Sequence, residues 1–250
     1  MAVGARGPDL IDTLVLQSHR QPLPAAWLER CLTSVRDWAA DCGFGYEFLG
    51  DELFEGVPQA VLANTGERLT ARSDLARLLR IAERLDVGAR RVVWLDADVL
   101  IYKPEALQLP SVDFAVGREC WLSLSGDTPK IGRAVHNAVL LFERGNPLLD
   151  FYCWSAEHML TRHNGPMVPQ LVGPKLLTLL HNAIELPVLE SVGVASPTLI
   201  ESLARAERDL LALVDQAHGG QLAALNLSAS VTCELPEVDA AIDCLLSLPA

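Results

Sequence analysis

Lysine is scarce in this chain, and positive charge as a whole is in the minority. The 32 aspartates and glutamates outnumber the 20 lysines and arginines, which leaves a net charge of −12. A protein that binds nucleic acid needs a basic face, so this balance argues against a nucleic-acid partner. An acidic protein that binds a diphosphate must take its positive charge from a metal ion or from a few well-placed arginines.

Long apolar runs are also missing. No stretch of about 18 or more apolar residues occurs, which argues against a membrane span. Residues 1–7 show no apolar segment after a basic start, so we expect no secretory signal. The six cysteines include no Cys-x-x-Cys pair, which does not fit zinc ligation. Without a signal, they indicate reduced thiols in a cytoplasmic protein.

The composition that remains is that of a globular protein, with 50% hydrophobic and 21% charged residues over 250 positions. Apolar and β-branched residues predict a strand over 11–16, helical spacing predicts a helix over 25–40, and a second short strand follows over 46–49. This β-α-β opening predicts an α/β fold with a parallel sheet. No repeat or linker interrupts the sequence, so we expect a single domain over residues 1–250.

Further elements are expected along the rest of the chain. One helix should begin near Ser73, which would be its N-cap, and another should begin at Gly173-Pro174. The patterns predict strands over 112–116 and 136–142, and helices over 148–160 and 197–216. The stretch 117–130 is polar and rich in Gly, Ser and Pro, and we expect it to be a mobile loop over a site.

The most informative stretch is a short apolar strand over 92–95 that ends in Asp96-Ala97-Asp98. It delivers two carboxylates to the rim of a sheet, where ligands bind in open α/β folds. No basic residue follows them closely, and a divalent cation with oxygen ligands would neutralise them. The alternative is that Asp96 and Asp98 are solvated turn residues or helix caps.

Several segments together resemble the donor site of retaining GT-A glycosyltransferases, with families 32 and 8 the most similar. These are Ser73-Asp74-Leu75-Ala76-Arg77-Leu78-Leu79-Arg80, Val93-Trp94-Leu95-Asp96-Ala97-Asp98-Val99, the strand that opens with Asn137, and Gly173-Pro174 with Thr178. The resemblance implies a Rossmann-like, mostly parallel central sheet flanked by helices. It also implies that residues 1–103 are a nucleotide-sugar-binding half, and that residues 104–250 are an acceptor half with C-terminal helices.

The resemblance implies a role for each matching residue. Asp98 would coordinate Mn²⁺ or Mg²⁺ directly, and Asp96 would contact the ribose or donor sugar and assist the metal. Asp74 and Arg77 would hold the sugar and the diphosphate, and Asn137 would hydrogen-bond the sugar. Asp74, Asp96 and Asp98 are therefore the candidate catalytic residues.

Other positions are implied for the base and for the metal. The end of the first strand would flank the nucleotide base, and the third metal ligand must come from the C-terminal part. The usual later motifs of both families are absent here, since no Trp follows the Asn and Ser residues near the C-terminus. The candidates are Leu16, Gln17, Ser18 and Ala97 for the nucleotide, and Asn226 and His218 for the metal.

These features predict a metal-dependent glycosyltransferase that moves a sugar, with retention, from a UDP-sugar or GDP-sugar to an unknown acceptor. One alternative is a haloacid-dehalogenase-like phosphatase with Asp96 as nucleophile, which would need a downstream lysine such as Lys130 or Lys175. Another alternative is a non-catalytic GT-A-like protein that binds a nucleotide sugar or serves as a scaffold.

Overall fold

The computed structural model describes residues 11–66, 68–165, 168 and 170–249, so residues 1–7 lie outside it. Its central sheet has six strands in the order β2-β1-β3-β6-β5-β7. Strand β1 runs parallel to β2 and β3, and β5 runs parallel to β7, whereas β6 is antiparallel to β3 and β5. The sheet is mostly parallel, as expected. Its bounds are β1 Thr13–Ser18, β2 Gly45–Leu49, β3 Arg91–Leu95, β5 Phe114–Ser125, β6 Thr128–Glu143 and β7 Val188–Leu189.

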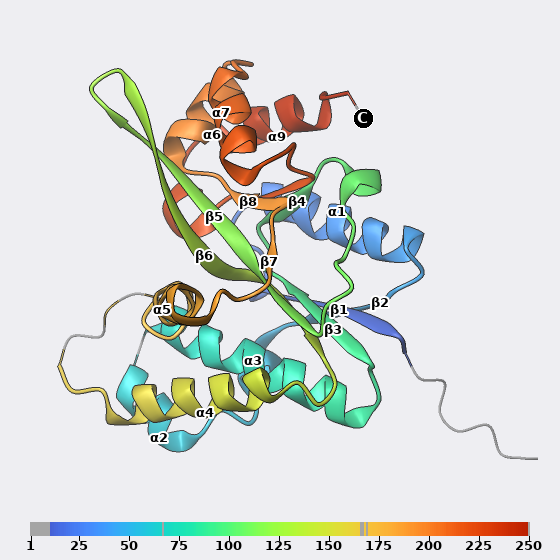
Figure 1. Cartoon of the computed structure of the whole chain (residues 1–250), viewed down its shortest axis with the longest axis vertical. Coiled ribbons are helices and arrows are strands. Elements are labelled where there is room, and N and C mark those ends of the chain that lie inside the picture. Colours follow the sequence, from blue (N-terminus) through green and yellow to red (C-terminus); the bar gives the residue numbers. More distant parts are fainter. Residues whose placement is uncertain (1–10, 67, 166–167, 169, 250) are drawn as a thin grey trace, which may run out of the picture.

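The predicted β-α-β opening is confirmed. Helix α1 (Trp27–Asp41) connects β1 to β2, and its apolar stripe is buried, as the helical spacing of those residues requires. On the other face of the sheet lie α2 (Gln59–Thr65), α3 (Leu69–Val87), α4 (Pro147–Arg162) and α5 (Pro174–Ile184) (Figure 1). Leu75, Leu78 and Ile81 of α3 share one core with Trp94 of β3.

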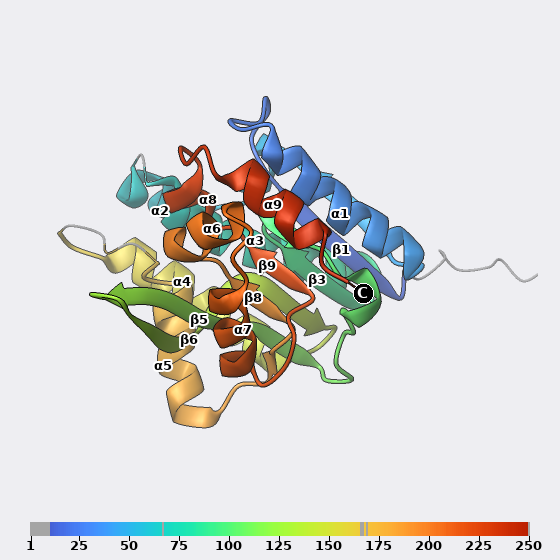
Figure 2. The same ribbon diagram turned by 90° about the horizontal axis from the view of Figure 1, so that it is seen from above.

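A second, three-stranded sheet stands beside the first, in the order β4-β9-β8. Figure 2 shows it among the C-terminal helices, near α1. Among the described residues, no helix is both long and apolar enough to span a bilayer. The elements are β4 Val99–Ile101, β8 Val192–Val194, β9 Ala224–Asn226, α6 Pro197–Ala204, α7 Asp209–His218, α8 Ala229–Thr232 and α9 Val238–Leu246, with 3-10 turns η1 Asp51–Phe54 and η2 Pro104–Ala106.

The prediction of a mobile loop over residues 117–130 is wrong. These residues form the outer part of a long β-hairpin, in which β5 and β6 pair to their tips through a turn at Gly126-Asp127 (Figure 1). Gly126 has a φ of 61°, which suits glycine and closes the turn. Cys120 and Leu122 are buried on one face of β5, so the stretch is held in place by packing despite its polar composition.

Two helix boundaries also differ from expectation. Helix α3 begins at Leu69, so Ser73 lies inside the helix and cannot be its N-cap. The segment 197–216 forms two helices, α6 and α7, because the chain turns at Ala206, which has a left-handed φ of 58°. The turn is closed by Glu207, whose backbone N–H donates to the carbonyl of Ser202.

Candidate functional site

Asp96 follows β3 directly and is held at the edge of the central sheet by its backbone. Its N–H donates to the Ala138 carbonyl at 2.8 Å, and its own carbonyl accepts from Nε2 of Gln17 at 3.2 Å. Its side-chain Oδ1 accepts from Nε1 of Trp94 at 2.7 Å and from Arg77 at 2.8 Å. These contacts involve Oδ1 alone, so Oδ2 keeps its capacity to accept.

Asp98 precedes β4, and the C-terminal part of the chain holds its side chain. Nδ2 of Asn226 donates to Oδ1 at 2.6 Å, and the backbone N–H of Ala229 donates to Oδ2 at 2.7 Å. Burial, together with the nearby charge of Asp96, raises the pKa of Asp98 to about 6. Asp98 is therefore a partly buried carboxylate that has hydrogen-bond donors but no ion-pair partner among the described residues.

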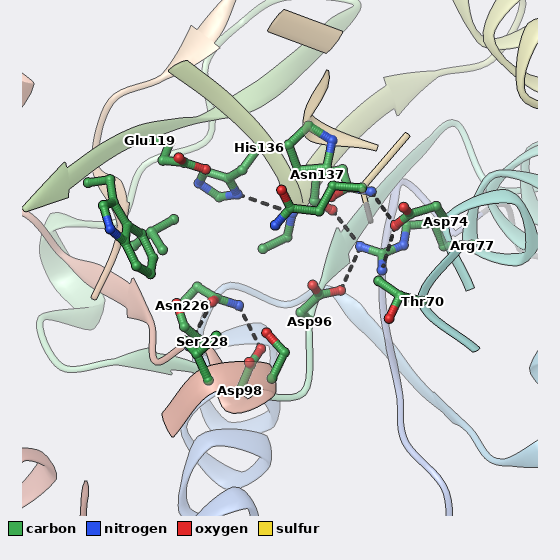
Figure 3. A pocket seen from close by; sticks show the side chains of 17 residues that line it. Thr70, Asp74, Arg77, Asp96, Asp98, Glu119, His136, Asn137, Asn226 and Ser228 are labelled. Carbon is green, nitrogen blue, oxygen red and sulfur yellow. Dashed lines mark hydrogen bonds and ion pairs between the residues drawn. The ribbon is translucent and has the colours of Figure 1, made fainter. Parts of the chain in front are cut away.

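Arg77, on α3, links the neighbouring carboxylates (Figure 3). The guanidinium lies 2.8 Å from Asp96 and 3.3 Å from Asp74, and it donates to the backbone carbonyl of Asn137 at 2.7 Å. It also lies over the ring of Trp94, 5.3 Å from the centroid. The side chain is buried, and most of its donors are used within the protein, so its main effect is to fix Asp74 and Asp96 relative to each other.

Asp74 and Asn137 form a second buried pair beside this arginine. Nδ2 of Asn137 donates to Oδ1 of Asp74 at 2.7 Å. Oδ2 of Asp74 is buried and has no hydrogen-bond partner within the part of the chain that the structure describes. Burial raises the pKa of Asp74 to about 6, although the charge of Arg77 opposes this shift. The pair lies against Gly173, where a Cβ atom would stand only 2.6 Å from Oδ2 of Asp74.

Two pockets flank the aspartate pair, and both are lined by Arg77, Asp96, Asp98 and Ser230. The first, of about 520 Å³, is drawn in Figure 3 and has Asp74 and Asn137 at one end and Glu119 at the other. The second, of about 500 Å³, lies at the ends of β1 and β2. Its walls include Ser18, His19, Gly50, Asp51, Phe54, Ser73, Trp94 and Ala97.

The residues proposed for the nucleotide lie in different environments. Ser18 and Ala97 line the second pocket. Leu16 is fully buried in the core, and Gln17 is buried with its amide between the Asp96 carbonyl and the hydroxyl of Tyr46. Neither of these two side chains is among the residues that line the pockets, so both contribute by positioning the end of β1.

The two candidates for a third metal ligand are separated in space. His218 lies under β8, where its Nδ1 is 2.9 Å from the Glu190 carbonyl, and it lines neither pocket. Asn226 contacts Asp98 through its amide nitrogen, while its Oδ1 accepts from the backbone N–H of Ser228 at 2.9 Å. Because a backbone N–H can only donate, this contact fixes the orientation of the Asn226 amide.

The structure adds residues that the sequence did not single out. Glu119 and Trp121 of β5 and His136 of β6 line the first pocket, opposite Asp74. Glu119 and Trp121 lie in the stretch 117–130, for which the sequence analysis expects a loop, whereas His136 opens a predicted strand and carries no motif that singles it out. The signal was present: two runs joined by a Gly-Asp dipeptide are typical of a hairpin, and residues 119 and 121 alternate with the apolar Cys120 and Leu122.

Asp96 and Asp98 are the residues of this site that could hold a divalent cation. Among the described residues, no group of three or more His, Cys, Asp or Glu side chains is arranged to hold a metal. Asp96 and Asp98 nevertheless place two carboxylates together with one arginine between the pockets, and Asp98 has no cation of its own. Two hard oxygen donors with excess negative charge fit Mg²⁺ or Mn²⁺, whose remaining ligands would be phosphate oxygens and water.

The phosphatase alternative is not favoured. Lys130 is exposed on the β5–β6 hairpin, and Lys175 is exposed on α5. Neither lysine lines a pocket beside Asp96. The cation that contacts Asp96 is Arg77.

Comparison with solved structures shows the fold. A glycosyltransferase involved in the glycosylation of the major capsid of PBCV-1 matches 93% of this chain and 98% of its own, with a TM-score of 0.50 and 10% identity. The chain has a GT-A glycosyltransferase fold.

Two further structures match the GT-A fold of this chain more distantly. The galactosyltransferase LgtC matches with 14% identity and a TM-score of 0.48 over 95% of this chain and 96% of its own. Mouse xyloside xylosyltransferase 1 matches with 14% identity and a TM-score of 0.45 over 88% of this chain and 98% of its own. No protein-family model and no curated protein matches the sequence.

Proposed function

We propose that this protein is a glycosyltransferase that takes a sugar from a UDP-sugar or GDP-sugar, with Mn²⁺ or Mg²⁺, and transfers it with retention. The observation that carries the proposal is Asp98, a partly buried carboxylate that has no ion-pair partner among the described residues and stands beside Asp96 between two pockets. Such an arrangement suits a ligand that brings a cation with it. The GT-A fold supports the same reading.

The two pockets suggest how a nucleotide sugar would lie. The second pocket, with Ser18, Asp51 and Phe54 in its walls, would receive the nucleoside. The first pocket would receive the sugar, because Asp74 and Asn137 offer buried polar atoms there. The diphosphate would then lie beside Asp96 and Asp98, which line both pockets.

Asp98 and Asp96 would hold the cation. When bound there, Mn²⁺ or Mg²⁺ would supply positive charge opposite the negative charge that develops on the departing nucleoside diphosphate. Asn226 and the N–H of Ala229 hold the Asp98 carboxylate in place, and Arg77 and Trp94 hold Asp96. We assign Asn226 to positioning Asp98, because its own carbonyl oxygen accepts from Ser228.

Asp74 would contribute to sugar binding. Its enclosed Oδ2 has no partner among the described residues, and a small turn of the side chain toward the first pocket would let it accept a hydrogen bond from a sugar hydroxyl. Its negative charge also favours the positive character that the sugar ring acquires as the leaving group departs. We assign no protein nucleophile, and transfer on the same face would be assisted by the leaving phosphate.

We further propose that the reaction takes place in the cytoplasm. All six cysteines of the chain are free thiols. Five of them lie partly or fully buried in the fold, at Cys31, Cys120, Cys153, Cys233 and Cys244. Reduced thiols of this kind are typical of proteins that work in a reducing compartment.

The test is a screen of UDP-sugars and GDP-sugars for thermal stabilisation and for release of the nucleoside diphosphate, with Mn²⁺, with Mg²⁺ and with chelator. We expect one donor to raise the melting temperature of the protein. We also expect that donor to be slowly hydrolysed only when metal is present. Binding without any turnover, even with candidate acceptors, would support the non-catalytic alternative. The absence of binding by every donor would exclude the proposed function.

A further inference from the structure

Glu119 is the most isolated carboxylate of the first pocket. Among the described residues, none donates a hydrogen bond to it and none forms an ion pair with it. Burial alone raises its pKa, since no charged group contributes to the shift. A partly buried carboxylate that faces a pocket without a partner is free to accept hydrogen bonds from a ligand.

Trp121 lies two positions further along β5 and therefore on the same face of the sheet, beside Glu119. Both residues line the first pocket, and Val231 of α8, which is 54% exposed, adds a further apolar surface. An aromatic ring next to a hydrogen-bonding group offers one apolar face and one polar contact to the same ligand.

The strand that pairs with β5 leaves this surface uncovered. The residues directly across from Glu119 and Trp121 on β6 are Ala134 and Gly132. Residues directly opposite each other in an antiparallel pair point to the same face. A Cβ atom placed at Gly132 would meet no atom within 4 Å, so open space lies beside the indole.

Resting on the proposed function, we infer that Trp121 and Glu119 form the acceptor subsite and that the acceptor is a neutral saccharide. The C–H face of a sugar ring would pack on the indole, and its hydroxyls would donate to the Glu119 carboxylate. Asp74 and Asn137 occupy the opposite end of the pocket, so the acceptor would approach the donor sugar from the Glu119 end (Figure 3).

The net negative charge of the first pocket disfavours charged acceptors. Its walls carry more carboxylates than cations, which disfavours an acceptor with a phosphate or carboxylate group. An ammonium group would satisfy both Glu119 and the indole but would bring no hydroxyl to the donor sugar. A neutral saccharide supplies the apolar face, the hydrogen-bond donors and the nucleophilic hydroxyl together. The carboxylates are Asp74, Asp96, Asp98 and Glu119, and the cation is Arg77.

The test is calorimetric titration of the full chain with glucose, galactose, mannose, N-acetylglucosamine, lactose and maltose, with MnCl₂ and either UDP or GDP present. Nα-acetyl-lysine amide and glucose 6-phosphate serve as charged probes. Three variants are compared with the wild type: Trp121→Ala, Gly132→Val, and Trp154→Ala as a control. Trp154 is an exposed tryptophan on α4 that lines neither pocket.

We expect at least one neutral saccharide to bind, and both Trp121→Ala and Gly132→Val to weaken its binding about tenfold or more. Gly132→Val fills the open space without removing any pocket side chain, and its melting temperature shows that it folds. Trp154→Ala should bind as the wild type does.

Three results would overturn the inference: no neutral saccharide binds, binding survives in both pocket variants, or a charged probe binds more tightly than every neutral sugar. Titrations of UDP and GDP with MnCl₂ are read separately. Failure of both nucleotides would count against the proposed function, while saccharide binding would still report on this subsite.

Discussion

The backbone of Gly173 lies directly against the carboxylate of Asp74. A Cβ atom at position 173 would stand 2.6 Å from Oδ2 of Asp74 and 2.8 Å from Nδ2 of Asn137. We expect Gly173→Ala to push this buried pair aside and to lower the unfolding free energy by about 2 kcal/mol. Chemical denaturation measures the effect. Gly220→Ala is the control, since a Cβ atom there meets no atom within 4 Å, and an equal loss in both variants would refute the packing argument.

Arg77 provides the ion-pair partner for two carboxylates at once. Replacement by methionine would leave Asp74 and Asp96 without it, and we expect a loss of about 3 to 5 kcal/mol in unfolding free energy. Adding Asp74→Asn to Arg77→Met should recover part of the loss, because one unpaired charge is then removed. Arg162→Met, at an exposed helix end, is the matched control. A double variant no more stable than Arg77→Met would contradict this account.

We expect His136 to make the unfolding free energy depend on pH below pH 6.5. Burial lowers its pKa from 6.5 to about 4, with Asp96 opposing the shift and His218 adding to it. The contribution of neutral His136 to the unfolding free energy is therefore complete above pH 6.5. It is lost as the pH falls toward 4, by about 3 kcal/mol in all.

The measurement is the unfolding free energy of the wild type and of His136→Gln from pH 7.5 to pH 4. The gap between the two proteins should narrow as the pH falls. The comparison with the variant is needed because Asp74, with a pKa raised to about 6, acts in the opposite direction: it favours the folded state most when it is protonated. A gap that stays constant would show that His136 does not titrate as stated. His158→Gln controls for the loss of an imidazole elsewhere.

We expect Asn226 to affect stability and metal binding by positioning the carboxylate of Asp98. Asn226→Ala removes a 2.6 Å hydrogen bond from a partly buried carboxylate, so we expect a loss of about 1 to 3 kcal/mol in unfolding free energy. We also expect Mn²⁺ affinity to fall about tenfold, as is typical when a group that orients a ligand is lost. Calorimetric titration with MnCl₂ gives the affinity, with Asn182→Ala on the exposed side of α5 as the control. Unchanged affinity would mean that Asn226 does not position Asp98.

The parts of the fold that follow local pattern could be predicted from the sequence. The strand before Asp96 and the stripe of α1 carry strong apolar periodicity, and both form as expected. The polar composition of residues 117–130 hides the hairpin, which is indicated instead by the Gly126-Asp127 pair and by the alternation around Cys120 and Leu122. Cys120 and Leu122 pack in a core with residues of the C-terminal helices, a contact that local sequence does not show. The start of α3 also differs from the prediction. The helix begins at Leu69, four residues before Ser73, the polar residue that resembles an N-cap.

In the candidate site, too, some features follow from residue type and others depend on contacts between distant residues. Asp74, Asp96, Asp98 and Asn137 line one pocket and come from three separate segments, while the roles that the resemblance implies for them remain proposals. Residue type alone could not show that Arg77 would be enclosed by its partners, or that Asn226 would turn its nitrogen toward Asp98. Both outcomes depend on contacts between residues far apart in the sequence.

The central claim is that Asp98 holds a divalent cation for a nucleoside diphosphate. The most direct measurement is calorimetric titration of UDP and GDP into the wild type and Asp98→Asn, each with MnCl₂ and with chelator. Asn has nearly the same shape as Asp but no negative charge. The account predicts that manganese strengthens nucleotide binding in the wild type and that this gain disappears in Asp98→Asn. An equal gain from manganese in both proteins would contradict it.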